Sequence, residues 1–207
     1  MRQINVLTFL SLDGVMQGPG GPEEDRSGGF SHGGWSVGYF DDAVRQEMGR
    51  EMGRPFDLLL GRRTYDIFAS HWPRVTEPGA DMGINKAAKY VATNRPLTTG
   101  WNGTAVRLQG DVAEAVRKLQ AGAGPELQVH GSGTLIQTLL AADLVDELWL
   151  KIFPVTIGSG RRLFAEGTRH AGFALVETSA SPSGVIIAKY RRAGEVKAGS
   201  FALPDPR

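Results

Sequence analysis

The sequence predicts an α/β protein with three layers, in which helices cover both faces of a central, mostly parallel sheet. Short runs of branched apolar residues, typical of buried strands, alternate along the chain with amphipathic segments. The pattern ends in two strands joined by a Ser-Pro-Ser-Gly turn at 181–184, which places an antiparallel hairpin at one edge. With 207 residues, of which 41% are hydrophobic, the chain suits one domain with a substantial core.

The first half of the chain alternates buried strands with helices. The glycine- and proline-rich segment at 18–34 is too polar and too interrupted to be a core element. Asp41 and Asp42 mark the start of an amphipathic helix, which stops near Gly53. The predicted elements are a strand at 4–10, the helix that ends near Gly53, a strand at 56–60 closed by Gly61, and a helix at 64–70.

The second half continues the alternation and ends in the hairpin. Asp111 caps the clearest helix, whose apolar residues recur every three and four positions. The predicted elements are strands at 89–93 and 105–108, a helix at 112–120, a strand at 126–130, a helix at 134–140, a strand at 144–155 and two strands within 173–192. We therefore predict a single domain at 1–192, followed by a loose tail at 193–207 of small, charged and proline residues.

Composition excludes several classes of function. The formal net charge of +1 gives no long-range field for nucleic acid or an anionic membrane. The chain has no cysteine, so disulfides and thiolate metal ligands are excluded, and its four histidines lack metal-ligand spacing. No apolar run approaches the roughly 20 residues that span a bilayer, and no signal peptide pattern is present. We expect a soluble, cytoplasmic protein without a metal, acting on a small molecule.

Three glycine-bearing turns follow predicted parallel strands, at 13–14, 61–65 and 131–134. The carboxyl ends of such strands meet at one edge of the sheet, where ligands bind. The turn Gly131-Ser132-Gly133-Thr134 opens a helix, whose free N–H groups and dipole suit a phosphate. However, Ile136 stands where a dinucleotide fingerprint has its third glycine. Alone, this turn is either a phosphate cradle or a structural turn.

The turn at 61–65 strengthens the phosphate interpretation. Gly61-Arg62-Arg63-Thr64-Tyr65 brings two guanidinium groups and a hydroxyl to a strand-to-helix junction, and arginine forks match phosphate oxygens. The alternative is a solvated arginine pair on an exposed turn. Thr93-Asn94-Arg95, after the third strand, adds two short polar side chains and another arginine. Three such turns at one edge favour a phosphate-binding rim.

Six segments of the sequence carry a family resemblance in their order and spacing. They are FLSLDGV (9–15), HGGW (32–35), LLLGRRTYDIF (58–68), KYVATN (89–94), VHGSGTLIQTLL (129–140) and LVDELWLKIFPVTIGSGRRLF (144–164). Together they resemble the dihydrofolate reductase superfamily, and more closely its bacterial branch related to the reductase domain of the riboflavin-biosynthesis protein RibD. The resemblance covers residues 4–190 and implies a dihydrofolate reductase-like fold.

The resemblance implies NADPH as cofactor. Its pyrophosphate would lie on two turns and its 2′-phosphate near the first turn and the residues after the third strand. We favour NADPH over NADH because arginines would face that phosphate. The implied cofactor-binding residues are Val15, Gly61, Arg62, Arg63, Thr64, Thr93, Asn94, Arg95, Gly131, Ser132, Gly133, Thr134 and Leu135.

The resemblance also places the substrate between the loop at 11–15, against which the nicotinamide would lie, and the first long helix. Its implied walls are Ser11, Trp35, Tyr39, Tyr65 and Phe153. The acidic residue that dihydrofolate reductases carry on this helix falls near Val44 or Arg45 here, which argues against folate as substrate. Asp13 and Asp42 are the remaining candidates for catalysis, and their alternative roles are a turn-former and a helix cap.

We therefore expect an NADPH-dependent reductase that transfers a hydride to a C=N or C=O of a small pterin-like, pyrimidinone-like or carbonyl substrate. The proton would come from water held by Asp13 or Asp42. A homodimer is implied by the RibD branch, with the strand at 144–153 contributing to the interface. The alternative is a non-catalytic, dimeric module that binds a dinucleotide or another ligand.

Overall fold

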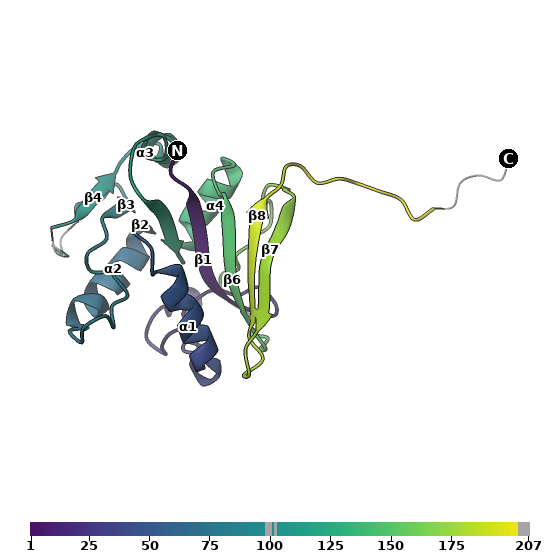
Figure 1. Cartoon of the computed structure of the whole chain (residues 1–207), viewed down its shortest axis with the longest axis horizontal. Helices are drawn as coiled ribbons and strands as arrows, with labels where there is room; N and C mark the ends of the chain where they lie inside the picture. Colours follow the sequence, from purple (N-terminus) through teal and green to yellow (C-terminus); the bar gives the residue numbers. More distant parts are fainter. Residues whose placement is uncertain (98–100, 102, 203–207) are drawn as a thin grey trace.

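The computed structural model describes residues 1–97, 101 and 103–202. Within them, eight strands form one sheet in the order β4-β3-β2-β5-β1-β6-β8-β7, accompanied by four α-helices (Figure 1). The strands are β1 (Ile4–Ser11), β2 (Phe56–Gly61), β3 (Lys89–Ala92), β4 (Ala105–Leu108), β5 (Glu126–His130), β6 (Glu147–Phe153), β7 (Phe173–Ala180) and β8 (Ile186–Arg192). The α-helices are α1 (Asp42–Glu51), α2 (Arg62–His71), α3 (Val112–Ala121) and α4 (Gly133–Ala141). Short 3-10 helices lie at Ser27–Gly29, Val37–Tyr39 and Trp72–Arg74.

The sheet is mostly parallel, as the alternation of strands and helices predicts. All pairs among β1 to β6 are parallel, whereas β8 runs antiparallel to β6 and β7 antiparallel to β8. The predicted parallel sheet and terminal hairpin are thus confirmed. Because β1, β2, β3 and β5 share one direction, the turns that follow them lie at the same edge of the sheet.

Helices cover both faces of the sheet, because successive strand residues point to opposite sides. On one face, Leu59 belongs to a buried cluster with Leu139 of α4. On the other face, Leu58 packs with Tyr65 of α2, and the neighbouring part of the sheet packs with Val44 of α1. The three-layer arrangement is therefore confirmed. None of the helices in the described part of the chain is both long and apolar enough to cross a bilayer.

Three predicted boundaries differ from the structure. Helix α2 begins at Arg62, so the arginine pair lies in the first helical turn, and α4 begins at Gly133. Strand β6 begins at Glu147 rather than at 144. The reason is a turn at Asp143, which has a φ of 54°, after which the Leu144 N–H donates to the Leu139 carbonyl at 2.9 Å. These contacts end α4 before the strand can start.

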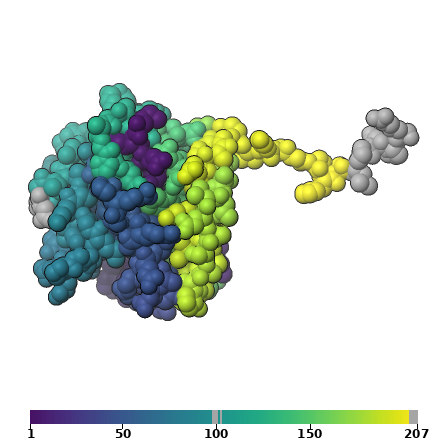
Figure 2. All heavy atoms as spheres, viewed as in Figure 1, coloured from purple at the N-terminus to yellow at the C-terminus, as the bar shows by residue number. Residues whose placement is uncertain are grey.

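The C-terminal segment leaves the body of the molecule later than predicted. The Ala193 N–H donates to the Gly172 carbonyl at 2.8 Å, and the Gly172 N–H donates to the Gly194 carbonyl at 2.7 Å. The described residues after Glu195 extend away from the domain (Figures 1 and 2). The last part of the predicted tail, 203–207, lies outside the described residues.

Candidate functional site

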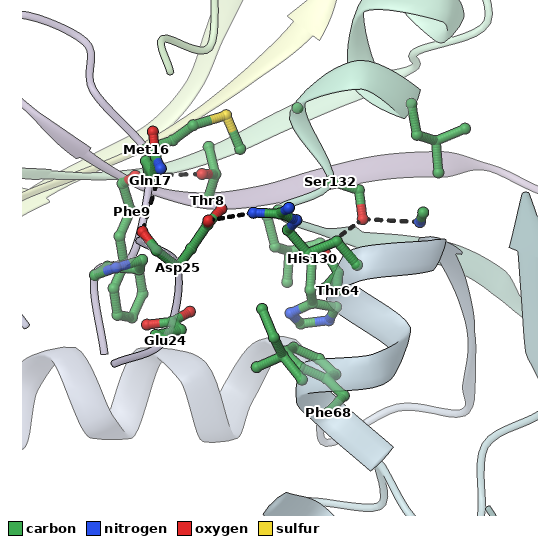
Figure 3. A pocket seen from close by; sticks show the side chains of 18 of the residues that line it. Thr8, Phe9, Met16, Gln17, Glu24, Asp25, Thr64, Phe68, His130 and Ser132 are labelled. Carbon is green, nitrogen blue, oxygen red and sulfur yellow. Dashed lines mark hydrogen bonds and ion pairs between the residues drawn. The ribbon is translucent and has the colours of Figure 1, made fainter. Parts of the chain in front are cut away.

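A cavity of about 660 Å³ opens where several parallel strands end (Figure 3). Its wall includes the ends of β1, β2 and β5, the first turns of α2 and α4, the last turns of α1 and the loop at 16–25. This volume is within the usual range for small-molecule and cofactor sites. The cavity therefore lies at the edge of the sheet that the three glycine-bearing turns predict.

Two of those turns are hydrogen-bonded to each other. The Ser132 hydroxyl accepts from the Gly61 N–H at 2.8 Å and donates to the Thr64 hydroxyl at 2.8 Å (Figure 3). A side chain at Gly61 would place its Cβ 3.3 Å from the Ser132 hydroxyl oxygen, closer than most Cβ contacts, so this approach favours glycine. Gly131 and Ser132 have φ values of 58° and 70°, which reverse the chain before α4. Residues 61–64 and 131–134 therefore form one site.

The two helices that start at this site differ from the other two at their first turns. Asp41 caps α1 by accepting from the Val44 N–H at 3.0 Å, and Asp111 caps α3 by accepting from the Glu114 N–H at 2.9 Å. No side chain caps the first turn of α2 or of α4. The free N–H groups and the positive dipole ends of these helices therefore face the cavity together, which suits an anionic ligand.

Arginines surround the starts of α2 and α4. Arg62 donates to the Asp66 carboxylate at 2.8 Å and to the Pro96 carbonyl at 2.7 Å, which fixes its guanidinium at the rim. Arg63 and Arg161 both form ion pairs with Asp25, the latter at 3.2 Å. Asp25 belongs to the loop that faces Thr64 and His130 across the cavity in Figure 3. A single carboxylate thus links an arginine of α2 with an arginine of the segment that follows β6.

A second, smaller cavity of about 260 Å³ adjoins the first and shares part of its wall. It is lined by three arginines, Arg26, Arg63 and Arg95, and by three carboxylates, Glu24, Asp25 and Asp66, together with Ile67. A cluster of guanidinium groups beside a larger cavity is suited to a second phosphate group.

The floor of the main cavity contains a buried ion pair between Glu51, the last residue of α1, and Lys151 of β6. The side chains are only 1% and 2% exposed, respectively. Burial raises the pKa of Glu51 and lowers the pKa of Lys151, and their mutual attraction opposes both shifts. Burial, together with the Lys151 charge, also lowers the pKa of the neighbouring His130 to about 3. The floor therefore holds charged groups away from water, next to a neutral imidazole.

Most predicted cofactor-binding residues line the main cavity. They are Gly61, Arg62, Arg63, Thr64, Arg95, Gly131, Ser132, Gly133, Thr134 and Leu135. Thr93 and Asn94 are not among the lining residues, because both shape the loop after β3. Thr93 Oγ1 accepts from the Arg95 N–H at 3.1 Å, and Asn94 Oδ1 accepts from the Gly110 N–H at 3.5 Å.

The predicted substrate walls lie behind the cavity surface. Val15, Tyr65 and Phe153 are 0% exposed, and Ser11 is 1% exposed. The Trp35 indole N–H donates to the Gln17 carbonyl at 2.8 Å. Its ring meets that of Phe153 edge-on, 5.5 Å between centroids. None of these residues, nor Tyr39, lines the cavity. Trp35 supports the loop at 16–20, and residues of that loop form the wall.

The two carboxylates predicted for catalysis lie outside the cavity as well. Asp13 accepts from the Ser11 hydroxyl at 2.6 Å, the Ile157 N–H at 3.1 Å and the Gly158 N–H at 2.8 Å. These hydrogen bonds, the Ser11 one foremost, hold the pKa of Asp13 well below its usual value, so it stays ionised. The Asp42 side chain is 92% exposed and lies 3.8 Å from Arg45. Asp13 thus joins two loops, and Asp42 faces solvent.

Several lining residues carried no functional prediction from the sequence. They include Glu51 and Lys151 on the floor, Thr8, Phe9 and His130 at strand ends, and Phe68 of α2. One signal was available: Lys151 is the lone cation in the apolar core of strand β6, ELWLKIF. A buried lysine requires an anionic partner, but only the fold brings Glu51 to it. In the described part of the chain, no group of three or more metal-ligating side chains comes together.

Comparisons with known proteins agree with this geometry. The sequence profile of the RibD C-terminal domain family matches residues 2–187. The uncharacterised protein YyaP of Bacillus subtilis (strain 168) is 28% identical over 133 residues, which are 62% of this chain and 70% of YyaP.

Solved structures share the fold. A candidate riboflavin biosynthesis protein from Shewanella sp. PV-4 superposes with a TM-score of 0.71 at 23% identity, covering 92% of this chain and 99% of that one. A pyrimidine reductase-like protein from Corynebacterium diphtheriae gives 0.60 at 14% identity, covering 94% and 93%. Dihydrofolate reductase from Enterococcus faecalis, in complex with NADP(H), gives 0.57 at 15% identity, covering 92% and 96%. At these identities the likeness concerns the fold alone.

Proposed function

Because the chain belongs to the RibD C-terminal domain family, we propose that it is an NADPH-dependent reductase of a small substrate with a C=N or C=O bond. The family and the dihydrofolate reductase-like fold are both of the reductase type. The observation that carries the finer proposal is the pair of uncapped helix starts, α2 and α4, facing one cavity among arginines. A pyrophosphate is the anion that such a pair suits.

The residues present fit the dinucleotide. The N–H groups at the starts of α2 and α4 would hold the pyrophosphate, and Thr64 and Ser132 keep the two starts together. The 2′-phosphate would lie near Arg63 and Arg95, which line both cavities. When bound, the cofactor supplies a hydride. The chain itself would bind and orient both partners and keep water away from them.

The substrate would occupy the inner part of the cavity, toward Glu51 and Lys151. Apolar side chains of α1, α2 and the loop before β3 line this part, among them Met48, Phe68 and Ile84. A flat heterocycle or a small carbonyl compound suits such a surface, because aromatic and thioether groups pack against ring faces. Polar groups of the substrate would meet the charged floor.

Titration of the purified protein with NADPH and with NADH, followed by nicotinamide fluorescence, tests cofactor binding. We expect micromolar binding of NADPH and weaker binding of NADH. Arg95→Met should weaken NADPH binding by about tenfold, because a charge-assisted contact to the 2′-phosphate is lost, and leave NADH binding unchanged. Lys118→Met, which removes an exposed helical ion pair with Glu114, is the control. No NADPH binding at micromolar concentrations would refute the proposal.

The same preparation discriminates the alternative of a binding module without turnover. NADPH absorbance is followed in the presence of dihydropterin, pyrimidinone and quinone probes. Steady oxidation that depends on a probe supports a reductase. Tight NADPH binding without oxidation by any of the probes favours the non-catalytic module.

A homodimer remains part of the proposal, but the predicted interface strand does not fit it. Strand β6 lies between β1 and β8, so its residues form the core. β7 is the edge strand, and exposed apolar side chains, Leu175, Val176 and Ile186, lie on this hairpin. A second copy would cover these side chains. Light scattering after size exclusion should give twice the chain mass, and Val176→Glu should give the monomer.

A further inference from the structure

The floor of the cavity contains a buried carboxylate oxygen whose capacity to accept a hydrogen bond is not used within the described part of the chain. Glu51 Oε2 is paired with Lys151 Nζ. Glu51 Oε1 is buried, and within the described part of the chain no hydrogen-bond donor reaches it. Lys189 Nζ lies 4.0 Å from it, beyond hydrogen-bond distance. A buried carboxylate oxygen without a donor is costly unless a ligand or a proton satisfies it.

The other carboxylates of the cavity differ from Glu51 in position. Glu24 and Asp25 belong to the loop at the mouth, where Glu24 accepts from the Gly20 N–H at 2.5 Å and Asp25 pairs with two arginines. Glu51 lies on the floor, beneath the apolar residues that suit a substrate. Among the described residues, it is therefore the one cavity carboxylate with a free oxygen at the inner end.

We propose that Glu51 is the acid that protonates the substrate, and that Lys151 is the residue that positions it. This inference rests on the proposed reductase function. As the C=N π bond breaks, the carbon takes the hydride of NADPH and the nitrogen takes the proton of Glu51. A C–H and an N–H bond form, the substrate is reduced and the cofactor is oxidised. Glu51 is left as a carboxylate beside the Lys151 ammonium, and solvent returns the proton after product release.

The charges around the pair favour this exchange. Glu47 of α1 and Lys189 of β8 form a second pair at 2.9 Å, and Glu47 also pairs with Arg50. His130 of β5 remains neutral beside Lys151. After proton transfer, Glu51 and Lys151 form a charge-balanced pair, which stabilises the new carboxylate. Before transfer, burial favours the protonated carboxyl group.

Gln128 of β5 and the shape of α1 hold this acid in place. The Gln128 amide donates to the Glu51 carbonyl at 3.0 Å and to the Glu126 carboxylate at 2.8 Å. Glu51 is thus fixed through both its backbone and its side chain. A fixed acid is a condition for efficient proton transfer, because the donor must lie within hydrogen-bond reach of the acceptor.

The first test compares Glu51→Gln, which has the same shape but cannot donate this proton, with Glu147→Gln as the control. Glu147 is a buried carboxylate of β6 that pairs with Arg191 and does not line the cavity. Each variant is assayed with a neutral imine probe, 7,8-dihydropterin, and with the same imine N-methylated to an iminium ion. The iminium already carries the positive charge, so its reduction needs no proton from the protein.

We expect Glu51→Gln to reduce the neutral imine about 100-fold or more slowly than the wild type. It should bind NADPH and reduce the iminium ion at the wild-type rate, whereas Glu147→Gln should keep both activities. Equal loss on both probes, or no loss on either, would overturn the role of Glu51. If the wild type binds NADPH but reduces neither probe, both the role of Glu51 and the reductase function are refuted. If the wild type does not bind NADPH, the proposed function is refuted by the binding titration, whatever the role of Glu51.

A second test does not depend on turnover. Infrared difference spectra over a pH series should contain a protonated carboxyl band that disappears in Glu51→Gln. In Lys151→Met, the band should persist to higher pH, because the cation that favours the carboxylate is gone, and Lys151→Arg should restore the wild-type titration. The same band in Glu51→Gln, or no shift in Lys151→Met, would contradict the assignment.

Discussion

The mouth and the floor of the cavity contain the same kinds of charged groups in opposite surroundings. At the mouth, Asp25 pairs with Arg63 and Arg161, whose side chains are 55% and 42% exposed. On the floor, Glu51 pairs with Lys151 with almost no exposure. The charged groups of exposed ion pairs readily exchange their partner for water or another ion. A buried ion pair stays together, because separating it would leave an uncompensated charge in the interior.

This difference suggests a division of roles. At the mouth, an incoming phosphate can replace the Asp25 carboxylate as the partner of Arg63 and Arg161, because a phosphate offers more oxygens to these guanidinium groups. The floor keeps its geometry and can change only its protonation. Binding of an anion and transfer of a proton thus need opposite degrees of exposure, and the cavity provides both.

The largest expected effect is on the floor. Lys151→Met removes the cation that pairs with Glu51, whose buried carboxyl group must then either remain charged without a partner or take up a proton. We expect a loss of ~3–5 kcal/mol in the free energy of unfolding, measured by urea titration. Replacing both partners in Glu51→Leu/Lys151→Met should recover most of this loss, because no uncompensated charge remains. At the mouth, Arg161→Met should cost at most ~1 kcal/mol. Equal losses at both places would remove the distinction between them.

The two regions should also separate by pH. His130 on the floor has a pKa lowered to about 3, whereas in the unfolded chain it binds a proton near 6.5. Since the unfolded state binds more protons between these values, stability should fall as the pH decreases from 6.5 to 3, by an amount on the order of 5 kcal/mol. His130→Gln should lack this dependence in urea titrations at a series of pH values.

The mouth contributes to acid stability only at lower pH. Partial burial tends to raise the pKa of Asp25, but hydrogen bonds from Ser27 and the charges of Arg161 and Arg63 lower it further than burial raises it. Its stabilising effect is therefore present above the ordinary Asp pKa of about 4 and is lost below it. A pH dependence of His130→Gln that equals that of the wild type between 4 and 6 would contradict the assignment to the floor.

A smaller effect is expected on cofactor binding at the mouth. Asp25→Asn removes the carboxylate that competes for Arg63 and Arg161, so NADPH should bind about threefold to fivefold more tightly. The gain should be greater at low than at high salt, because the pairs are exposed. Fluorescence titration at two salt concentrations measures it, with Glu114→Gln of α3 as control. Weaker binding in Asp25→Asn would mean that Asp25 orients the arginines instead of blocking them.

The smallest effect is expected for Asp42, which lies outside both regions. Its exposed side chain pairs only distantly with Arg45, so Asp42→Asn should keep the wild-type turnover and urea midpoint. A large loss of turnover would restore Asp42 as the catalytic carboxylate and would place the chemistry away from the cavity floor.

Local sequence patterns determined the elements and the position of the rim that we propose to bind phosphate. Residues 56–60 are a short, largely apolar run and residues 126–130 alternate polar and apolar side chains, and a glycine follows each segment. Both patterns are typical of strands. Because parallel strands all end at one edge, the turns at Gly61 and Gly131 had to be neighbours once the alternation was recognised. Arg63 and Arg95 follow from the same argument. Asp111 before an amphipathic run was sufficient to predict a capped helix.

Tertiary structure alone decided the inner end of the site and the fate of the aromatic side chains. Glu51 and Lys151 are a hundred residues apart, and neither belongs to a turn or a motif. Whether Tyr65 and Phe153 line a cavity or fill the layer behind it depends on how helices pack on the sheet, which periodicity does not specify. Periodicity assigns a residue to a face of its own element, whereas exposure depends on what covers that face. The sequence therefore predicted which turns form the rim of the cavity, whereas the Glu51–Lys151 pair on its floor depends on the packing of α1 against β6.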